Sequence, residues 1–141
     1  MAVRAPDKRI ESWSVTTRIA EANRWLVTLT DPAGVEWTAV GEDVFEGFAE
    51  ARKPLESSGF RFLVVGARPE YWPTGMSGDM GGGFDLWARY RCGFRNVFRT
   101  AIAIITRERG YRYIFAPAPA RKVTTAERQL AYRERWLAGG P

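Results

Sequence analysis

Apolar and polar residues alternate through most of the first forty positions, which is the spacing of half-buried β-strands. Segments 11–19, 24–30 and 35–40 are rich in Trp, Val and Thr, and Asp-Pro-Ala-Gly at 31–34 has the proline of a tight turn. This pattern predicts an antiparallel hairpin around that turn. The side chains expected on its inward faces are Trp25, Val27, Leu29, Val35, Trp37 and Ala39.

Apolar residues three or four positions apart predict three helices. Asp43, with Glu46 three residues on, is predicted to cap the first helix, and Gly59 to end it. Segment 94–109 has helical spacing but also strand-favouring Ile and Val, and we interpret it as a helix. The third helix is predicted between a capping box of Thr124 and Glu127 and the terminating Gly139. The apolar positions of the first helix are Val44, Phe48, Ala51 and Leu55.

Three further strands are expected at 60–68, 84–91 and 111–115, and Ala-Pro-Ala-Pro-Ala at 116–120 is interpreted as a stiff linker. The first of these strands is apolar on both faces, which is typical of a central strand. The element order β-β-β-α-β-β-α-β-α predicts one α+β domain over residues 1–141, a mostly antiparallel sheet with about three packed helices.

Composition then excludes several classes of protein. With 45% hydrophobic and 26% charged residues in 141 positions, the chain has the profile of a soluble globular protein. The longest aliphatic run, 101–105, is too short to span a bilayer, and residues 1–14 lack a signal sequence, so we expect a cytoplasmic protein without membrane contact. The single Cys92 and the absence of histidine exclude zinc sites and histidine-dependent nucleophiles. No cofactor, metal or catalytic residue is predicted.

The net charge of +5 is unevenly distributed along the chain. Segment 88–122 holds nine basic residues against Glu108 alone, whereas 41–56 holds five acids against two bases. A basic region of this kind indicates an acidic protein partner, a nucleic acid, or simply a solvated face. The three readings stay open at this point.

Five of the nine residues at 75–83 are glycine. A phosphate-binding loop is not indicated, because no lysine follows the glycines, a strand rather than a helix is expected next, and Asp79 would repel a phosphate. The segment is therefore a recognition loop or a passive connection. Aromatic residues and methionines outside a core are typical of protein-binding surfaces. The residues predicted to contact a partner are Arg68, Tyr71, Trp72, Met76, Asp79, Met80 and Arg89.

Two alternatives belong to other functional classes. Asp79, with Glu70 and Asp85, provides carboxylates for acid–base catalysis without histidine. The arginine-rich segment 88–122, with aromatic residues such as Tyr111 among its arginines, provides a nucleic-acid platform.

The segment GARPEYWPTGMSGDMGGG at 66–83 resembles a motif of small, mostly uncharacterised bacterial proteins: GAR, a few residues, WP(S/T)GM, two residues and DMGGG. The tail at 123–137 resembles the C-terminal helix of those proteins. The resemblance covers about 44–84 and the tail, segment 92–121 departs from it, and no activity comes with it. In size and type, the chain also resembles immunity proteins. These proteins are small, non-catalytic and cytoplasmic, and they occlude a toxin's active site.

Taken together, these observations predict a cytoplasmic, non-enzymatic protein-binding module of the immunity type. The positive net charge favours a toxin domain with an acidic cleft as the partner.

Overall fold

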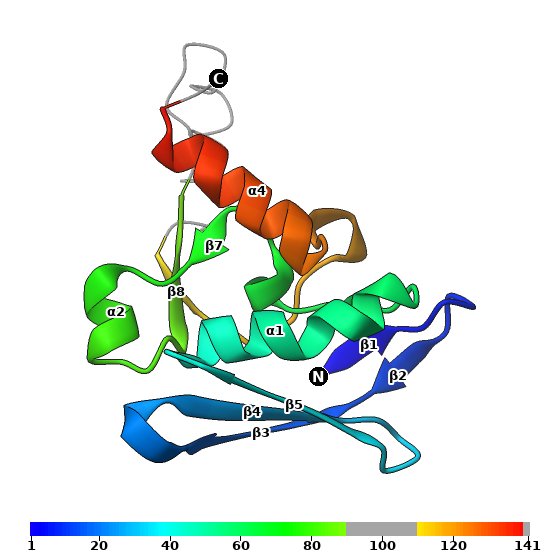
Figure 1. Cartoon of the computed structure of the whole chain (residues 1–141). Helices are drawn as coiled ribbons and strands as arrows, with labels where there is room; N and C mark the ends of the chain where they lie inside the picture. The colour runs from blue at the N-terminus through cyan, green and yellow to red at the C-terminus, as the bar shows by residue number, and fades with distance from the viewer. Residues whose placement is uncertain (90–109, 140–141) are drawn as a thin grey trace.

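The strands of the chain form three small antiparallel sheets, each of three strands, in the part of the chain that the structure describes (Figure 1). The structure is a computed structural model that describes residues 1–89 and 110–139. The sheets have the strand orders β2-β1-β6, β3-β4-β5 and β7-β8-β9. The strands are β1 (Ala2–Arg4), β2 (Ile10–Ser12), β3 (Ser14–Ile19), β4 (Trp25–Thr30), β5 (Glu36–Gly41), β6 (Arg61–Phe62), β7 (Tyr71–Trp72), β8 (Asp85–Ala88) and β9 (Tyr111–Tyr113).

The hairpin of β4 and β5 is confirmed. Leu29 pairs with Trp37 in its register, and the side chain of Trp37 stacks on Trp13 with 5.2 Å between ring centroids. Asp31 stabilises the turn, because its carboxylate accepts hydrogen bonds of 2.9 Å from the backbone N–H groups of Ala33 and Val35. The inward position predicted for Val35 is wrong, because this residue lies before the first residue of β5 and is exposed.

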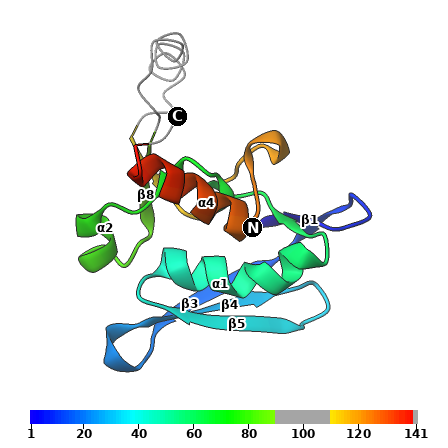
Figure 2. The ribbon, with the colours of Figure 1, turned by 45° about the horizontal axis from the view of Figure 1, so that its top comes forward.

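Helix α1 (Val44–Ser57) lies across one face of the β3–β4–β5 sheet, and α4 (Ala126–Leu137) lies on the far side of α1 (Figures 1 and 2). The four predicted apolar positions of α1 are all buried. Asp43 caps the helix by accepting a 2.8 Å hydrogen bond from the N–H of Glu46. The Glu46 carboxylate returns to the N–H of Glu42 rather than to that of Asp43, so the predicted capping box is shifted by one residue. Helices α1 and α4, the antiparallel strands and the buried core confirm the α+β prediction.

The strand predicted at 60–68 is wrong in its length. After β6, Val65–Ala67 forms a 3-10 turn, although the segment is as buried as its apolar residues predicted. The turn brings the backbone against the chain that follows β9: the N–H of Gly66 donates a 2.8 Å hydrogen bond to Ile114. A Cβ at Gly66 would lie 2.5 Å from the Ile114 side chain, so glycine permits this close approach.

The interpretation of 116–120 as a linker is also wrong. Val64 forms a β-bridge with Pro117, and the N–H of buried Ala118 donates to Leu63 at 2.9 Å. A 3-10 turn, Ala120–Lys122, follows. This segment is therefore hydrogen-bonded to the centre of the fold.

Helix α4 begins one residue later than predicted. Its N-cap is Thr125, which accepts from the N–H of Arg128, and not Thr124. Gly139 follows the helix in a left-handed conformation, as a terminating glycine does. The helix predicted at 94–109 lies outside the described residues, as does the end of the strand predicted at 84–91.

Candidate functional site

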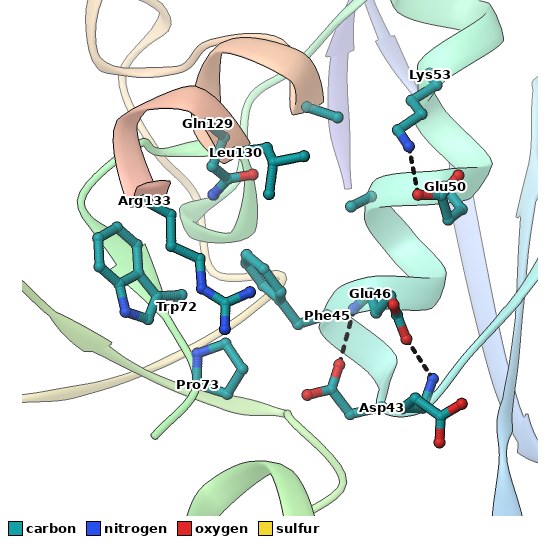
Figure 3. Close-up of a pocket in the computed structure, with 13 residues that line it drawn as sticks. Asp43, Phe45, Glu46, Glu50, Lys53, Trp72, Pro73, Gln129, Leu130 and Arg133 are labelled. Carbon is teal, nitrogen blue, oxygen red and sulfur yellow. Dashed lines mark hydrogen bonds and ion pairs between the residues drawn. The ribbon is translucent and has the colours of Figure 1, made fainter. Parts of the chain in front are cut away.

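A groove of about 350 Å³ lies between α1 and α4, and we call it the α1–α4 groove (Figure 3). Apolar side chains from three segments line it, namely Phe45 of α1, Trp72 and Pro73 at the end of β7, and Leu130 of α4. Its charged lining is mostly acidic, and all of it except one arginine of α4 comes from α1 and the two residues before that helix. The charged residues of the lining are Glu42, Asp43, Glu46, Glu50, Lys53 and Arg133.

Asp43 and Glu46 lie at the start of α1, on either side of Phe45 in the sequence (Figure 3). One oxygen of each carboxylate accepts a backbone hydrogen bond at the start of α1: Asp43 accepts from the N–H of Glu46, and Glu46 accepts from the N–H of Glu42. Burial raises the pKa of the Asp43 carboxyl, and the negative charge of Glu46 adds to the rise, while the capping hydrogen bond and the positive charge of Arg133 oppose it. An opposite charge nearby favours the ionised form of this carboxyl, which is the effect that Arg133 has on it.

Arg133 reaches from α4 into this groove, where its guanidinium lies between Pro73 and Phe45 (Figure 3). The residue is exposed and forms no ion pair within 4 Å with any described acid. The other acids have partners, since Glu50 pairs with Lys53 and Glu42 pairs with Arg24 at 3.3 Å. Of the two basic residues in the lining, Lys53 is therefore paired with Glu50, and Arg133 has no ion pair with a described acid.

The two helices that form the groove are joined by a buried polar network. Arg52 of α1 is fully shielded from solvent and donates to Glu56 Oε1 at 2.8 Å, to the Thr124 carbonyl at 3.1 Å and to Gln129 Oε1. Glu56 Oε2 in turn accepts the N–H of Ala126 at 2.7 Å, the first residue of α4. Burial raises the pKa of the Glu56 carboxyl, and the Arg52 charge opposes the rise.

Gln129 extends this network to a third segment. Its Nε2 donates to the backbone carbonyls of Gly66 at 3.1 Å, Arg68 at 2.7 Å and Tyr71 at 3.3 Å. Because the amide is buried, these bonds set the position of α4 against the chain leading into β7. Gln129 thus links α4 to the chain that leads into β7, and both segments contribute residues to the groove.

The glycine-rich segment is only partly a loop. Gly75–Asp79 forms the short helix α2, whose capping box joins Thr74 and Ser77. The glycines that follow pack tightly at the start of α1: the Gly82 carbonyl accepts the Val44 N–H at 2.9 Å, and a Cβ at Gly83 would lie 2.8 Å from Asp43. The segment therefore connects β7 to β8 as a docked structure, with α2 beside the groove.

The structure divides the seven predicted contact residues into two groups. Met76, Asp79 and Met80 are exposed on or next to α2, and the exposed fractions of the two methionines are 75% and 85%. Arg68, Tyr71 and Trp72 are buried, and Arg89 is half-buried. The predicted contact role of all seven stays a prediction, but only the first group offers an open surface.

The buried group has internal contacts instead. Arg68 pairs with Glu70, and its guanidinium lies over the Tyr71 ring at 4.7 Å from the centroid. Trp72 packs edge-on against Trp136 of α4, and the Arg89 guanidinium lies over both rings. Cation–π contacts of this kind stabilise the junction between α4 and the β7–β8–β9 sheet.

The carboxylates considered for catalysis do not line the groove. Glu70 is paired with Arg68, whereas Asp79 and Asp85 are exposed on α2 and β8. Within residues 1–89 and 110–139, no three acidic or cysteine side chains gather in a way that would hold a metal ion.

Sequence reasoning missed the α4 side of the groove and the acids opposite it. Leu130 and Arg133 follow a helical pattern that gives no indication of a groove, and the acids at 41–56 were noted only as a charge cluster. The contacts that bring these two segments together, such as Arg52 with Gln129, join residues far apart in the sequence.

No protein-family model matches this chain, and a search of curated proteins finds no significant relative. In the described part of the chain, no helix has both the length and the apolar content needed to cross a membrane.

Proposed function

We propose that this chain is a non-enzymatic protein-binding module whose contact surface is the α1–α4 groove together with Met76 and Met80 on the neighbouring α2 segment. One observation carries the proposal: a groove with an apolar lining lies beside two methionines that are almost fully exposed. Exposed apolar side chains next to a concave apolar surface are typical of protein contact sites, and methionine adapts to varied partners.

The buried hydrogen-bond network beside the groove supports this function. Arg52 and Gln129 hold α4 against α1 through buried hydrogen bonds, so the groove does not need to be ordered when a partner binds. Pre-organised surfaces lose less entropy on association and bind more tightly for the same area.

The immunity-type role is part of the proposal and rests on the resemblance of residues 66–83 and 123–137. In that role the module occludes a toxin domain by inserting α2 and receiving a toxin segment in the groove. The expected toxin with an acidic cleft stays a prediction that rests on the net charge of the chain.

Affinity capture with matched leucine variants tests the proposal. Leu130→Asp places a charge in the groove, and Leu137→Asp makes the same change on an exposed leucine of the same helix outside the lining. We expect one protein partner to be captured from the native lysate by the wild type and by Leu137→Asp, after nuclease treatment, and to be lost with Leu130→Asp. Equal capture by the two variants would contradict a contact through the groove.

Nucleic-acid binding is a second candidate, favoured by one specific feature. Trp72, Trp87 and Tyr111 are paired across β7, β8 and β9, so three aromatic residues form one cross-strand row, of which α4 covers Trp72 and leaves the other two accessible. Trp87, Tyr111 and Tyr113 remain 39%, 57% and 51% exposed, as the stacking of bases requires.

Fluorescence anisotropy with a labelled single-stranded oligonucleotide checks this candidate. Binding that falls steeply with salt and is lost in Trp87→Ala with Tyr111→Ala would support it. Binding unaffected by these changes would remove it.

A further inference from the structure

The charge of the α1–α4 groove is opposite to that of the whole chain. The chain carries a net charge of +5, whereas the groove lining has four acids against two bases. Lys53 is neutralised by Glu50 on the same helix, and Glu42 is neutralised by Arg24. Asp43, Glu46 and Arg133 are therefore the charged residues of the lining that form no ion pair with a described residue.

These two acids lie within reach of an apolar surface. Phe45 follows Asp43 on the first turn of α1, and Pro73 lies across the groove from it (Figure 3). Arginine and lysine have an apolar stem and a charged end, so an apolar surface that leads to carboxylates is complementary to both parts of such a side chain.

Arg133 shows that a basic side chain fits this position. Its stem passes Trp72, its guanidinium lies between Pro73 and Phe45, and its charge acts on Asp43. The side chain is exposed and makes no ion pair with the described acids, so it can leave the groove at little cost.

We infer that the α1–α4 groove binds a partner's peptide segment through one arginine or lysine, directed at Asp43 and Glu46, and an adjacent apolar side chain that packs on Phe45 and Leu130. The partner's cation takes the place that Arg133 holds in the free protein. This inference rests on the proposed protein-binding function and names the chemistry of the segment that the groove receives.

Selection from a phage-displayed library of random peptides tests the inference without knowledge of the natural partner. The purified full chain is the bait, and selected peptides are synthesised and measured by fluorescence polarisation against wild type and variants. We expect the selected peptides to share a basic residue next to a Leu, Ile, Phe or Trp.

The charge variant is Asp43→Asn with Glu46→Gln, which removes two negative charges and keeps an oxygen acceptor at each helix-capping position. It should weaken peptide binding about tenfold, the loss expected when charge-assisted hydrogen bonds become neutral. The matched control, Glu127→Gln with Glu134→Gln, removes two exposed acids of α4 that do not line the groove and should leave affinity unchanged. Circular dichroism of both variants verifies that they are folded.

Arg133→Ala should have the opposite effect on peptide affinity to that of the charge variant. Removing the side chain that competes with the partner's cation should strengthen binding about twofold to fivefold. A role of Arg133 as a partner contact would instead weaken binding, and that outcome overturns the inference.

The inference and the proposed function fail in different ways. The inference is overturned if the selected peptides lack basic residues, or if they bind the charge variant as tightly as the wild type. In either case, loss of binding in Leu130→Asp would still support the groove as a binding surface. Peptides that bind Leu130→Asp unchanged, or a selection without enrichment, overturn both.

Discussion

Arg52 and Glu56 form an ion pair of 2.8 Å one turn apart on α1, and both side chains are almost completely shielded from solvent. The pair also holds the start of α4, because Glu56 accepts the N–H of Ala126 and Arg52 donates to Gln129. The ion pair therefore links the last turns of α1 to the first turn of α4.

Replacing Arg52 with Met should lower the free energy of unfolding by about 3–5 kcal/mol, because it leaves the Glu56 carboxylate buried without its counter-ion. Urea titration followed by circular dichroism measures the loss. Arg52→Met with Glu56→Gln should cost less than the single change, since no unpaired charge remains. Equal losses in the two proteins would show that the ion pair is not what makes Arg52 important.

Gly83→Ala should destabilise the protein by at least about 1–2 kcal/mol, because the residue has a φ of +75° and the new Cβ would lie 2.8 Å from Asp43. Gly75→Ala is the matched change at the start of α2, where a Cβ meets no atom within 4 Å. It should alter stability by less than about 1 kcal/mol. Thermal unfolding compares the two, and similar losses would mean that the glycine-rich segment is not docked on α1.

The raised pKa of Asp43 makes part of the stability depend on pH. Burial keeps this pKa above its ordinary 3.8 in the folded protein, so the folded state binds the proton more tightly than the unfolded state. The contribution is fully present below pH 3.8 and is lost as pH rises through the raised value.

Asp43→Asn keeps a capping oxygen and removes this titration. The unfolding free energy of the variant minus that of the wild type should therefore increase as pH rises from below 3.8 and then level off. Urea titrations across that range measure the difference. If the unfolding free energies of the two proteins changed in parallel with pH, the pKa of Asp43 would not be raised. That result would contradict an environment in which burial and Glu46 outweigh Arg133.

The position of the α4 cap can be tested with adjacent threonines. Thr125→Ala should cost about 1 kcal/mol of stability because it removes the acceptor for the Arg128 N–H. Thr124→Ala should cost less, since the contacts of Thr124 with Arg52 and Ala67 use its backbone. A larger loss of thermal stability for Thr124→Ala than for Thr125→Ala would indicate that Thr124 is the N-cap, as the sequence predicted.

Local patterns predicted the local structure well. The pairing of Leu29 with Trp37 follows from two alternating strands around a proline-containing turn, and the Asp43 cap follows from its place before an apolar helical stripe. In both places one short stretch of chain contains most of the interactions that determine its structure.

Predictions were less successful where contacts with residues far away in the sequence determine the local structure or the burial of a side chain. The chain turns at Val65–Ala67 because hydrogen bonds to Ile114 and Ala116 replace those of a continuous strand, and the apolar sequence contains no sign of this. Arg52 likewise has the sequence context of an exposed helical arginine, and its burial depends on Gln129. The sequence likewise does not show that Trp136 of α4 packs on Trp72, whose role as a partner contact stays a prediction.

Gly82 lies against the indole of Trp25, so close that a Cβ in place of its hydrogen would be 2.7 Å from the ring. In nuclear magnetic resonance spectra, the aromatic ring current should therefore displace the Hα resonances of Gly82 from the usual glycine position. That signal reports directly on whether the glycine-rich segment is seated on the hairpin. Followed during a titration, it would distinguish a partner that binds the docked segment from one that lifts it away.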